Sequence, residues 1–194
     1  MQKRQDETPE KIGLLGGTFD PIHNGHLAIA SAAIRQAGLS SVIFIPAGDP
    51  PHKLKTAANA AERLEMVHLA AKADPRFLVS DYEVRKSGPS YSVDTVRHFK
   101  AVFPGAELYF IMGDDAYSAI STWHDAKTLL GLCRFLVFSR KNLPVSPPAQ
   151  KIEITPISIS STQIREGLKT KQNLSALMPE GVYAYILANH LYGR

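Results

Sequence analysis

The chain has 194 residues, of which 44% are hydrophobic and 21% charged, and its 22 Lys and Arg against 18 Asp and Glu give a formal net charge of +4. A domain of this size buries roughly 70% of the surface that its unfolded chain exposes, so this composition excludes disorder of the whole chain. No apolar run approaches the roughly 20 residues that span a bilayer, and the first ten residues lack the apolar core of a signal peptide. We therefore expect a cytoplasmic protein without a membrane partner.

The single cysteine and the distribution of charge along the chain exclude further classes of protein. Cys133 is the only cysteine, so no internal disulfide can form, and no set of Cys and His residues has the spacing of a zinc site. The positive excess is scattered along the chain, with no basic stripe interleaved with aromatic residues, which argues against a nucleic-acid partner. Small phosphorylated molecules suit this pattern better.

The first half of the chain alternates buried strands with helices. Residues 1–10 are polar and lack periodicity, so we expect a mobile tail there and a single domain over 11–194. The pattern then predicts, in order, a strand at Lys11–Gly17, a helix from His26 that ends at Gly38, a strand at Ser41–Ile45, a helix over Ala60–Ala73, a strand region over Arg76–Val84, a helix over Ser92–Phe103 and a strand at Glu107–Met112.

The second half is more helical. It predicts short helices at Asp114–Ile120 and Asp125–Leu130, a strand at Arg134–Ser139, a Pro-rich loop over Lys141–Gln150, a strand at Ile152–Ile157, a helix capped by Ser160 or Ser161 that runs to Leu168, and a terminal helix over Gly181–Leu191. Continuous apolar strands separated by helices are typical of an α/β fold. We expect a doubly wound, Rossmann-like parallel sheet with a helical C-terminal part.

The densest chemical signal is GGTFDPIHNGH, which runs from Gly16 to His26 between the first strand and the first helix. α/β sheets bind ligands at such a junction. The two glycines let backbone N–H groups approach a phosphate, and the helix N-terminus adds a positive partial charge. His23 and His26 lie three residues apart, so both imidazoles can face one anion and stabilise charge on a phosphoryl group. The structural alternative is a turn with two histidines that cap a helix.

A second segment, ISSTQIR at Ile159–Arg165, opens a late helix. The hydroxyls of Ser161 and Thr162 and the free N–H groups of the helix start form an anion site, which Arg165 can reach from one turn along. By itself the segment is also an ordinary Ser/Thr cap. The P-loop pattern GxxxxGK[ST], the GxGxxG fingerprint and the GxSxG elbow are all absent from the sequence.

Both segments have counterparts in one superfamily. GTFDPIHNGH resembles the HxGH motif of the nucleotidyltransferases, and ISSTQIR resembles their ISSTxxR element. PPHK at 50–53, SYSVDT at 90–95, IMGDD at 111–115 and TWH at 122–124 are similar to segments of the bacterial nicotinate-nucleotide adenylyltransferase family. The resemblance implies that ATP and nicotinate mononucleotide react to deamido-NAD and pyrophosphate in NAD biosynthesis. It also implies Mg²⁺ bound mainly through the ATP phosphates, without a dedicated metal site on the protein.

The resemblance assigns a role to each matching residue. His23 and His26 would contact the ATP phosphates and stabilise the transition state. The other ATP contacts would come from Gly16, Gly17, Thr18, Phe19, Asp115, Ser161, Thr162 and Arg165, with Asp115 on the ribose. The acceptor and its phosphate would be bound by Lys53, Ser92, Trp123, His124 and Arg140, with Trp123 stacked on the nicotinate ring and Ser92 near its carboxylate.

Several alternatives stay open at this point. Asp114 is an extra carboxylate beside Asp115, and we favour Asp115 for the nucleotide; Trp123 is alternatively a packing residue and Arg140 a solvated one. Phosphopantetheine adenylyltransferases and cytidylyltransferases share the HxGH scaffold, although SYSVDT argues against both. A non-catalytic nucleotide-binding regulator is a further reading, against which stand two intact phosphate-binding segments. The oligomeric state, monomer or homo-oligomer, is undecided.

Overall fold

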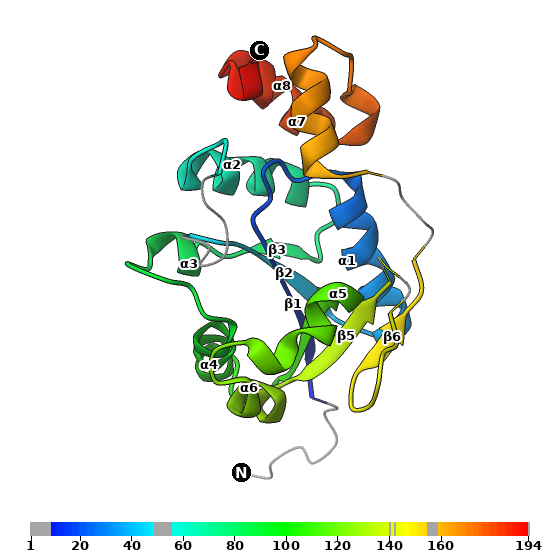
Figure 1. Ribbon diagram of the computed structural model, residues 1–194. Helices are drawn as coiled ribbons and strands as arrows, with labels where there is room; N and C mark the ends of the chain where they lie inside the picture. The colour runs from blue at the N-terminus through cyan, green and yellow to red at the C-terminus, as the bar shows by residue number, and fades with distance from the viewer. Residues whose placement is uncertain (1–8, 49–55, 140, 142, 155–158, 194) are drawn as a thin grey trace.

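The computed structural model describes residues 9–48, 56–139, 141, 143–154 and 159–193. Strands and helices alternate through most of this range (Figure 1). The strands are β1 Lys11–Gly17, β2 Ser41–Pro46, β3 Phe77–Val79, β4 Glu107–Gly113, β5 Arg134–Phe138 and β6 Gln150–Ile152. The α-helices are α1 Asn24–Ala37, α2 Ala60–Ala71, α3 Tyr82–Arg85, α4 Ser92–Val102, α5 Asp114–Ser118, α6 Ala126–Leu132, α7 Ser161–Lys169 and α8 Glu180–Ala188, and the 3-10 turns are η1 Ile120–Thr122, η2 Ser175–Leu177 and η3 Leu191–Gly193.

The strands form one parallel sheet in the order β3-β2-β1-β4-β5-β6. β1 lies at its centre, where Gly13 faces Val42 of β2 on one side and Tyr109 of β4 on the other. The chain winds outward from β1 to β3 and then crosses back to β4, so the direction of winding changes between β1 and β4. A ligand crevice is expected above the carboxyl ends of these two strands. The expected doubly wound sheet is confirmed.

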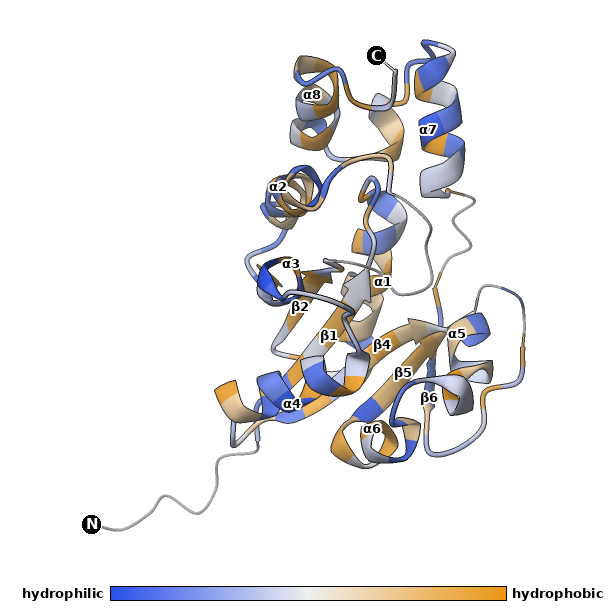
Figure 2. Cartoon of the chain, turned by 60° about the vertical axis from the view of Figure 1, so that its left-hand side comes forward, coloured by the Kyte–Doolittle hydropathy of each residue, from blue (hydrophilic) through white to orange (hydrophobic). Residues whose placement is uncertain are grey.

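Helices cover both faces of the sheet because alternate strand residues point to opposite sides. On one face Leu15, Phe44 and Leu136 pack against α1, α2, α7 and α8 in one apolar cluster. On the other face Leu14, Ile43 and Val137 pack against α4, α5 and α6 in a second cluster. Figure 2 shows the apolar colour running along the strands between these helix layers. The C-terminal helices therefore share a core with the sheet, and the expected helical C-terminal part is confirmed.

Several expected elements differ from the structure by one or two residues at an end, and three differ more. β3 stops at Val79, because the Ser80 hydroxyl accepts from the Tyr82 N–H and the Asp81 carbonyl accepts from the Arg85 N–H, which starts α3 in place of the strand expected to Val84. β6 begins at Gln150 and ends at Ile152; beyond it the N–H and carbonyl of Glu153 bond to the Gln36 side-chain amide of α1, and residues 155–158 lie outside the described ranges.

The terminal helix, expected to reach Leu191, ends earlier, at Ala188. The Asn189 amide donates to the Tyr185 carbonyl at the helix end, and His190 has a left-handed backbone with φ of 51°. The chain then closes with the turn η3, which packs against α7 and α8. None of the helices in the described part of the chain has the length and apolar character of a membrane span.

Candidate active site

A cavity of about 1550 Å³ opens above the carboxyl ends of β1 and β4. A pocket for one drug-sized ligand typically measures about 300 to 1000 Å³, so this cavity has room for two substrates side by side. All the site residues expected from the sequence that the structure describes line it, namely Gly16, Gly17, Thr18, Phe19, His23, His26, Ser92, Asp115, Trp123, His124, Ser161, Thr162 and Arg165. Lys53 and Arg140 lie outside the described residues.

The loop after β1 is shaped by one glycine and one strained aromatic residue. Phe19 has a φ of 50°, which is rare for a residue with a bulky side chain. Its buried ring folds back over Gly17, where an added Cβ would lie 2.9 Å from ring carbons, and packs edge-on against His26 at 5.0 Å between ring centroids. Gly17 is therefore needed for the loop to close, and backbone strain of this kind is typical of a functional site.

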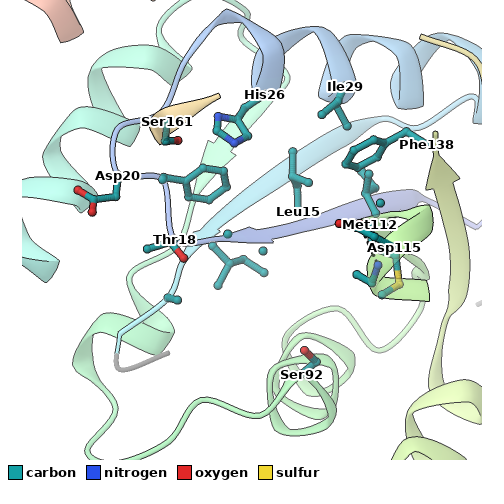
Figure 3. Close-up of a pocket in the computed structure, with 18 of the residues that line it drawn as sticks. Leu15, Thr18, Asp20, His26, Ile29, Ser92, Met112, Asp115, Phe138 and Ser161 are labelled. Atoms are coloured by element: carbon teal, nitrogen blue, oxygen red, sulfur yellow. Dashed lines mark hydrogen bonds between the residues drawn. The ribbon is translucent and has the colours of Figure 1, made fainter. Parts of the chain in front are cut away.

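His23 and His26 open helix α1 as a stacked pair. Their ring centroids lie 3.8 Å apart with 27° between the planes, and His23 is only 6% exposed. Nδ1 of His26 accepts the backbone N–H of His23 at 3.2 Å, so in the neutral ring the proton sits on Nε2. Figure 3 shows the His26 ring pointing into the space that the labelled side chains enclose. Its Nε2–H is then the N–H donor of the ring.

The start of α7 is joined to the same loop. The Ser161 hydroxyl donates to the Pro21 carbonyl at 2.9 Å, and Nη1 of Arg165 donates to the Asp20 carbonyl at 2.7 Å. Nη2 of Arg165 also reaches the Thr162 hydroxyl at 3.3 Å, while Ser160 caps the helix. The two signature segments, about 140 residues apart in the chain, thus form one wall of donors and cationic groups.

The two neighbouring aspartates at the end of β4 differ in environment. Asp114 is fully buried, and its carboxylate accepts hydrogen bonds from the N–H groups of Asp115, Lys141 and Leu143 and from the Ser139 hydroxyl. Asp115 is half-buried and lines the cavity. Geometry therefore makes Asp114 the residue that anchors the loop after β5, and Asp115 the one that faces the cavity (Figure 3).

The opposite wall comes from α4 and from the segment before α6. Ser92 begins α4 and lies across the cavity from His26 and Ser161 (Figure 3). Tyr91 stacks on His124 with ring centroids 4.2 Å apart, which joins the SYSVDT and TWH segments. Trp123 is partly buried, with its ring edge-on to Phe110 at 6.2 Å, and also lines the cavity. Both open readings of Trp123, packing and ligand contact, are thus compatible with its position.

Sequence reasoning missed a half-buried carboxyl in this wall. Glu83 lines the cavity and its Oε1 accepts the Thr95 hydroxyl at 2.6 Å. Desolvation raises the pKa of Glu83, and the hydrogen bond from Thr95 only partly opposes that rise. An apolar part of the cavity was also missed, formed by Leu15, Ile29, Met112 and Phe138. A sequence pattern marks these as strand and helix core residues, so nothing in it distinguishes them from packing.

Metal ligands do not gather in the part of the cavity that the structure describes. Within the described ranges no group of three or more His, Cys, Asp and Glu side chains could hold a metal ion. Asp20, the carboxylate next to the histidine loop, accepts from the N–H groups of Ala57 and Ala58 and from the Tyr192 hydroxyl. Its oxygens are therefore engaged by protein donors.

Comparison with known proteins gives the class and then the family. The cytidylyltransferase-like family model matches residues 14–167, so fold and site together define a nucleotidyltransferase. A probable nicotinate-nucleotide adenylyltransferase from Clostridium botulinum is 39% identical over 92% of this chain and 97% of its own length. One from Dehalococcoides mccartyi is 40% identical over 95% and 98%. The chain belongs to the nicotinate-nucleotide adenylyltransferase family.

Solved structures agree on the fold. A Plasmodium falciparum nicotinic acid mononucleotide adenylyltransferase complexed with NaAD superposes with a TM-score of 0.80, covers 94% of this chain and 97% of its own, and is 19% identical. A putative nicotinate-nucleotide adenylyltransferase from Vibrio parahaemolyticus has a TM-score of 0.72, covers 94% and 95%, and is 17% identical. At these identities the likeness supports the Rossmann-like α/β architecture.

Proposed function

We propose that this protein transfers AMP from ATP to nicotinate mononucleotide, releasing pyrophosphate and forming deamido-NAD. The observation that carries the proposal is the meeting of the HxGH loop and the α7 start on one wall of a cavity with room for two nucleotides. Family membership supports the reaction class and the acceptor.

The reaction is an in-line attack of the acceptor's 5′-phosphate on the α-phosphorus of ATP, with pyrophosphate as leaving group. The attacking oxygen is already anionic at neutral pH, so the protein needs no general base. It must position two anions and stabilise the charge that builds up between them. We assign this work to Nε2–H of His26, to His23 beside it, to the backbone N–H groups of Gly16 to Phe19, and to Arg165.

The divalent ion fits this donor set as a ligand of the phosphates. Magnesium prefers oxygen ligands and usually binds through substrate phosphates and one or two carboxylates. Asp20, the carboxylate within the histidine loop, accepts from three protein donors. When bound, Mg²⁺ would neutralise phosphate charge, while this chain's own residues orient the phosphates. We assign Asp115 to the ATP ribose, and Lys53 and Arg140 to further phosphate contacts.

The acceptor side favours an acid over an amide. We place the nicotinate ring against Trp123 and its carboxylate near Ser92 and the backbone around His124. A site with donors aimed at a carboxylate leaves them unpaired when a neutral amide binds, which typically costs about 1 to 3 kcal/mol. We expect kcat/KM for nicotinate mononucleotide to exceed that for nicotinamide mononucleotide by at least about tenfold. Equal kcat/KM values would refute the assignment of this subsite.

The test is pyrophosphate release from ATP and Mg²⁺ with three separate acceptors: nicotinate mononucleotide, nicotinamide mononucleotide and phosphopantetheine. We expect turnover with the first acceptor and a fall of about 100-fold or more in kcat for His26→Ala. The matched control is His68→Ala, since His68 is exposed in the last turn of α2 and does not line the cavity. Turnover with phosphopantetheine alone would show that the acceptor is a different one. ATP binding without turnover would indicate a non-catalytic nucleotide-binding regulator.

A further inference from the structure

The carboxylate of Asp20 joins the phosphate loop to two distant parts of the chain. Its Oδ2 accepts the Ala57 N–H at 2.7 Å, and its Oδ1 accepts the Ala58 N–H at 3.1 Å, so it fixes the segment just before α2. Oδ1 also accepts the hydroxyl of Tyr192 at 2.8 Å, from the last turn of the chain, 172 residues away. In Figure 3 the Asp20 side chain points away from the His26 ring.

The backbone carbonyls of Asp20 and Pro21 hold two side chains that are proposed to contact ATP. The carbonyl of Asp20 accepts from Arg165, and the carbonyl of Pro21 accepts from Ser161. A second tie runs from the completely buried Arg63 of α2, whose guanidinium donates to the Thr18 carbonyl at 2.7 Å. The position of residues 18–21 therefore sets where Arg165 and the loop N–H groups lie.

Tyr192 is built to be a fixed donor in this arrangement. It is 8% exposed, does not line the cavity, and its hydroxyl also lies 4.0 Å from the Met66 sulfur. Burial and the neighbouring Asp20 carboxylate raise the pKa of the Tyr192 phenol, so the hydroxyl stays protonated and donates. A buried carboxylate that loses one of its three donors is free to rotate toward other partners, and the loop that carries it follows.

We infer that Tyr192 is a positioning residue for ATP, which acts through Asp20 to hold the phosphate loop against Arg165. Tyr192 belongs to none of the signature segments, and no sequence pattern marks it. The inference rests on the proposed adenylyl transfer. It predicts a selective effect, because among the described residues no hydrogen bond or ring contact joins Ser92 or Trp123 to Asp20 or Tyr192, and we expect that wall of the cavity to stay in place.

The test compares Tyr192→Phe with a matched control. Tyr192→Phe removes only the hydroxyl and keeps the ring in its apolar site. We expect kcat/KM for ATP to fall about tenfold, because a small misplacement of phosphate-binding groups is costly, while KM for nicotinate mononucleotide stays within about twofold. Tyr109→Phe is the control: Tyr109 is also buried and its hydroxyl donates to the Glu107 carboxylate at 2.7 Å, but at the opposite end of the sheet.

A merely structural role gives a different result. In that case both variants lower Tm by similar amounts and leave the kinetic constants for ATP unchanged, which would overturn the inference. A double-mutant cycle adds Asp20→Asn: if Tyr192 acts through Asp20, the loss in kcat/KM for the double variant is clearly smaller than the product of the two single losses. Independent, multiplying losses would also overturn it. If Asp20→Asn does not fold, the comparison of Tyr192→Phe with Tyr109→Phe decides alone.

Calorimetric ATP binding separates this inference from the proposed function. A wild-type protein that binds ATP but turns over no acceptor contradicts the proposed reaction. The Kd for ATP then tests Tyr192 directly, with an expected weakening of about fivefold to tenfold in Tyr192→Phe and none in Tyr109→Phe. A wild-type protein that does not bind ATP overturns both statements.

Discussion

Adjacent aspartates at the end of β4 illustrate how burial separates structural from functional roles at the scale of one residue. Asp114→Ala removes a buried carboxylate that accepts hydrogen bonds from four donors, so we expect unfolding free energy to fall by about 3 kcal/mol or more. Asp115→Ala should change unfolding free energy by less than about 0.5 kcal/mol and raise KM for ATP about tenfold. Urea unfolding and steady-state kinetics on both variants test these two expectations. A loss of stability in Asp115→Ala together with a raised KM for ATP in a stable Asp114→Ala would contradict the assignment.

The half-buried carboxyl of Glu83 should make stability depend on pH. Burial raises its pKa above the ordinary value of 4.5, so between these two values the folded protein binds more protons than the unfolded chain. The contribution of Glu83 to stability is therefore fully present below pH 4.5 and is lost as pH rises through the folded-state pKa. Glu83→Gln keeps an acceptor for Thr95 and removes this loss, so its Tm should exceed that of wild type at pH 7.

The measurement is Tm of wild type and Glu83→Gln in a series of buffers from pH 4 to 8. The difference in Tm between the two proteins should grow with pH over this range. A difference that is constant with pH, or that reverses sign, would show that the Glu83 carboxyl has an ordinary pKa.

At the scale of elements, α3 lies so close to the end of β2 that one glycine is required there. A Cβ on Gly48 would lie 2.1 Å from the carbonyl oxygen of Glu83, which belongs to the backbone and cannot rotate away. Gly48→Ala should therefore lower unfolding free energy by about 2 kcal/mol and raise KM for the acceptor, since the Glu83 wall must shift. Gly131→Ala in α6, with nothing within 4 Å of its Cβ, should leave stability unchanged or raise it by up to about 1 kcal/mol.

Elements were predictable where a continuous apolar run or a capping residue decides, and their bounds were wrong where a local turn or a distant side chain competes with the strand. β1, β2, β4 and β5 read as apolar runs, and Gly38 ends α1 in the left-handed conformation that glycine favours. The strand expected to Val84 failed because Ser80 and Asp81 form a local turn that competes with the sheet ladder. The strand expected from Ile152 does not continue into Glu153, because Gln36, more than a hundred residues earlier, bonds to the Glu153 backbone.

At the scale of the whole molecule, the sequence located the site through segments that carry their own chemistry. Glycines, paired histidines and a hydroxyl-rich helix start are typical of a phosphate site, whatever the tertiary contacts around them. Asp20 lies within such a segment, yet its role depends on Tyr192, and Glu83 acquires its raised pKa only by burial. These properties arise from tertiary contacts between distant residues, so one sequence without its structure does not contain a readable signal for them.

The two apolar clusters share the central sheet, and from this we propose that residues 11–194 unfold as one domain. Trp123, the only tryptophan, packs against the cluster of α4 and α6, while α7 and α8 belong to the other cluster. Trp123 fluorescence and far-UV circular dichroism should therefore report the same Tm.

Bound ATP should raise this common Tm. ATP at 100 times its Kd adds about 2.7 kcal/mol to the free energy of unfolding, which for a domain of this size raises Tm by about 5 to 10 °C. Both probes should move together, because the cavity is lined by the β1 loop and by α7; an ATP-dependent shift in only one probe would divide the chain into two units.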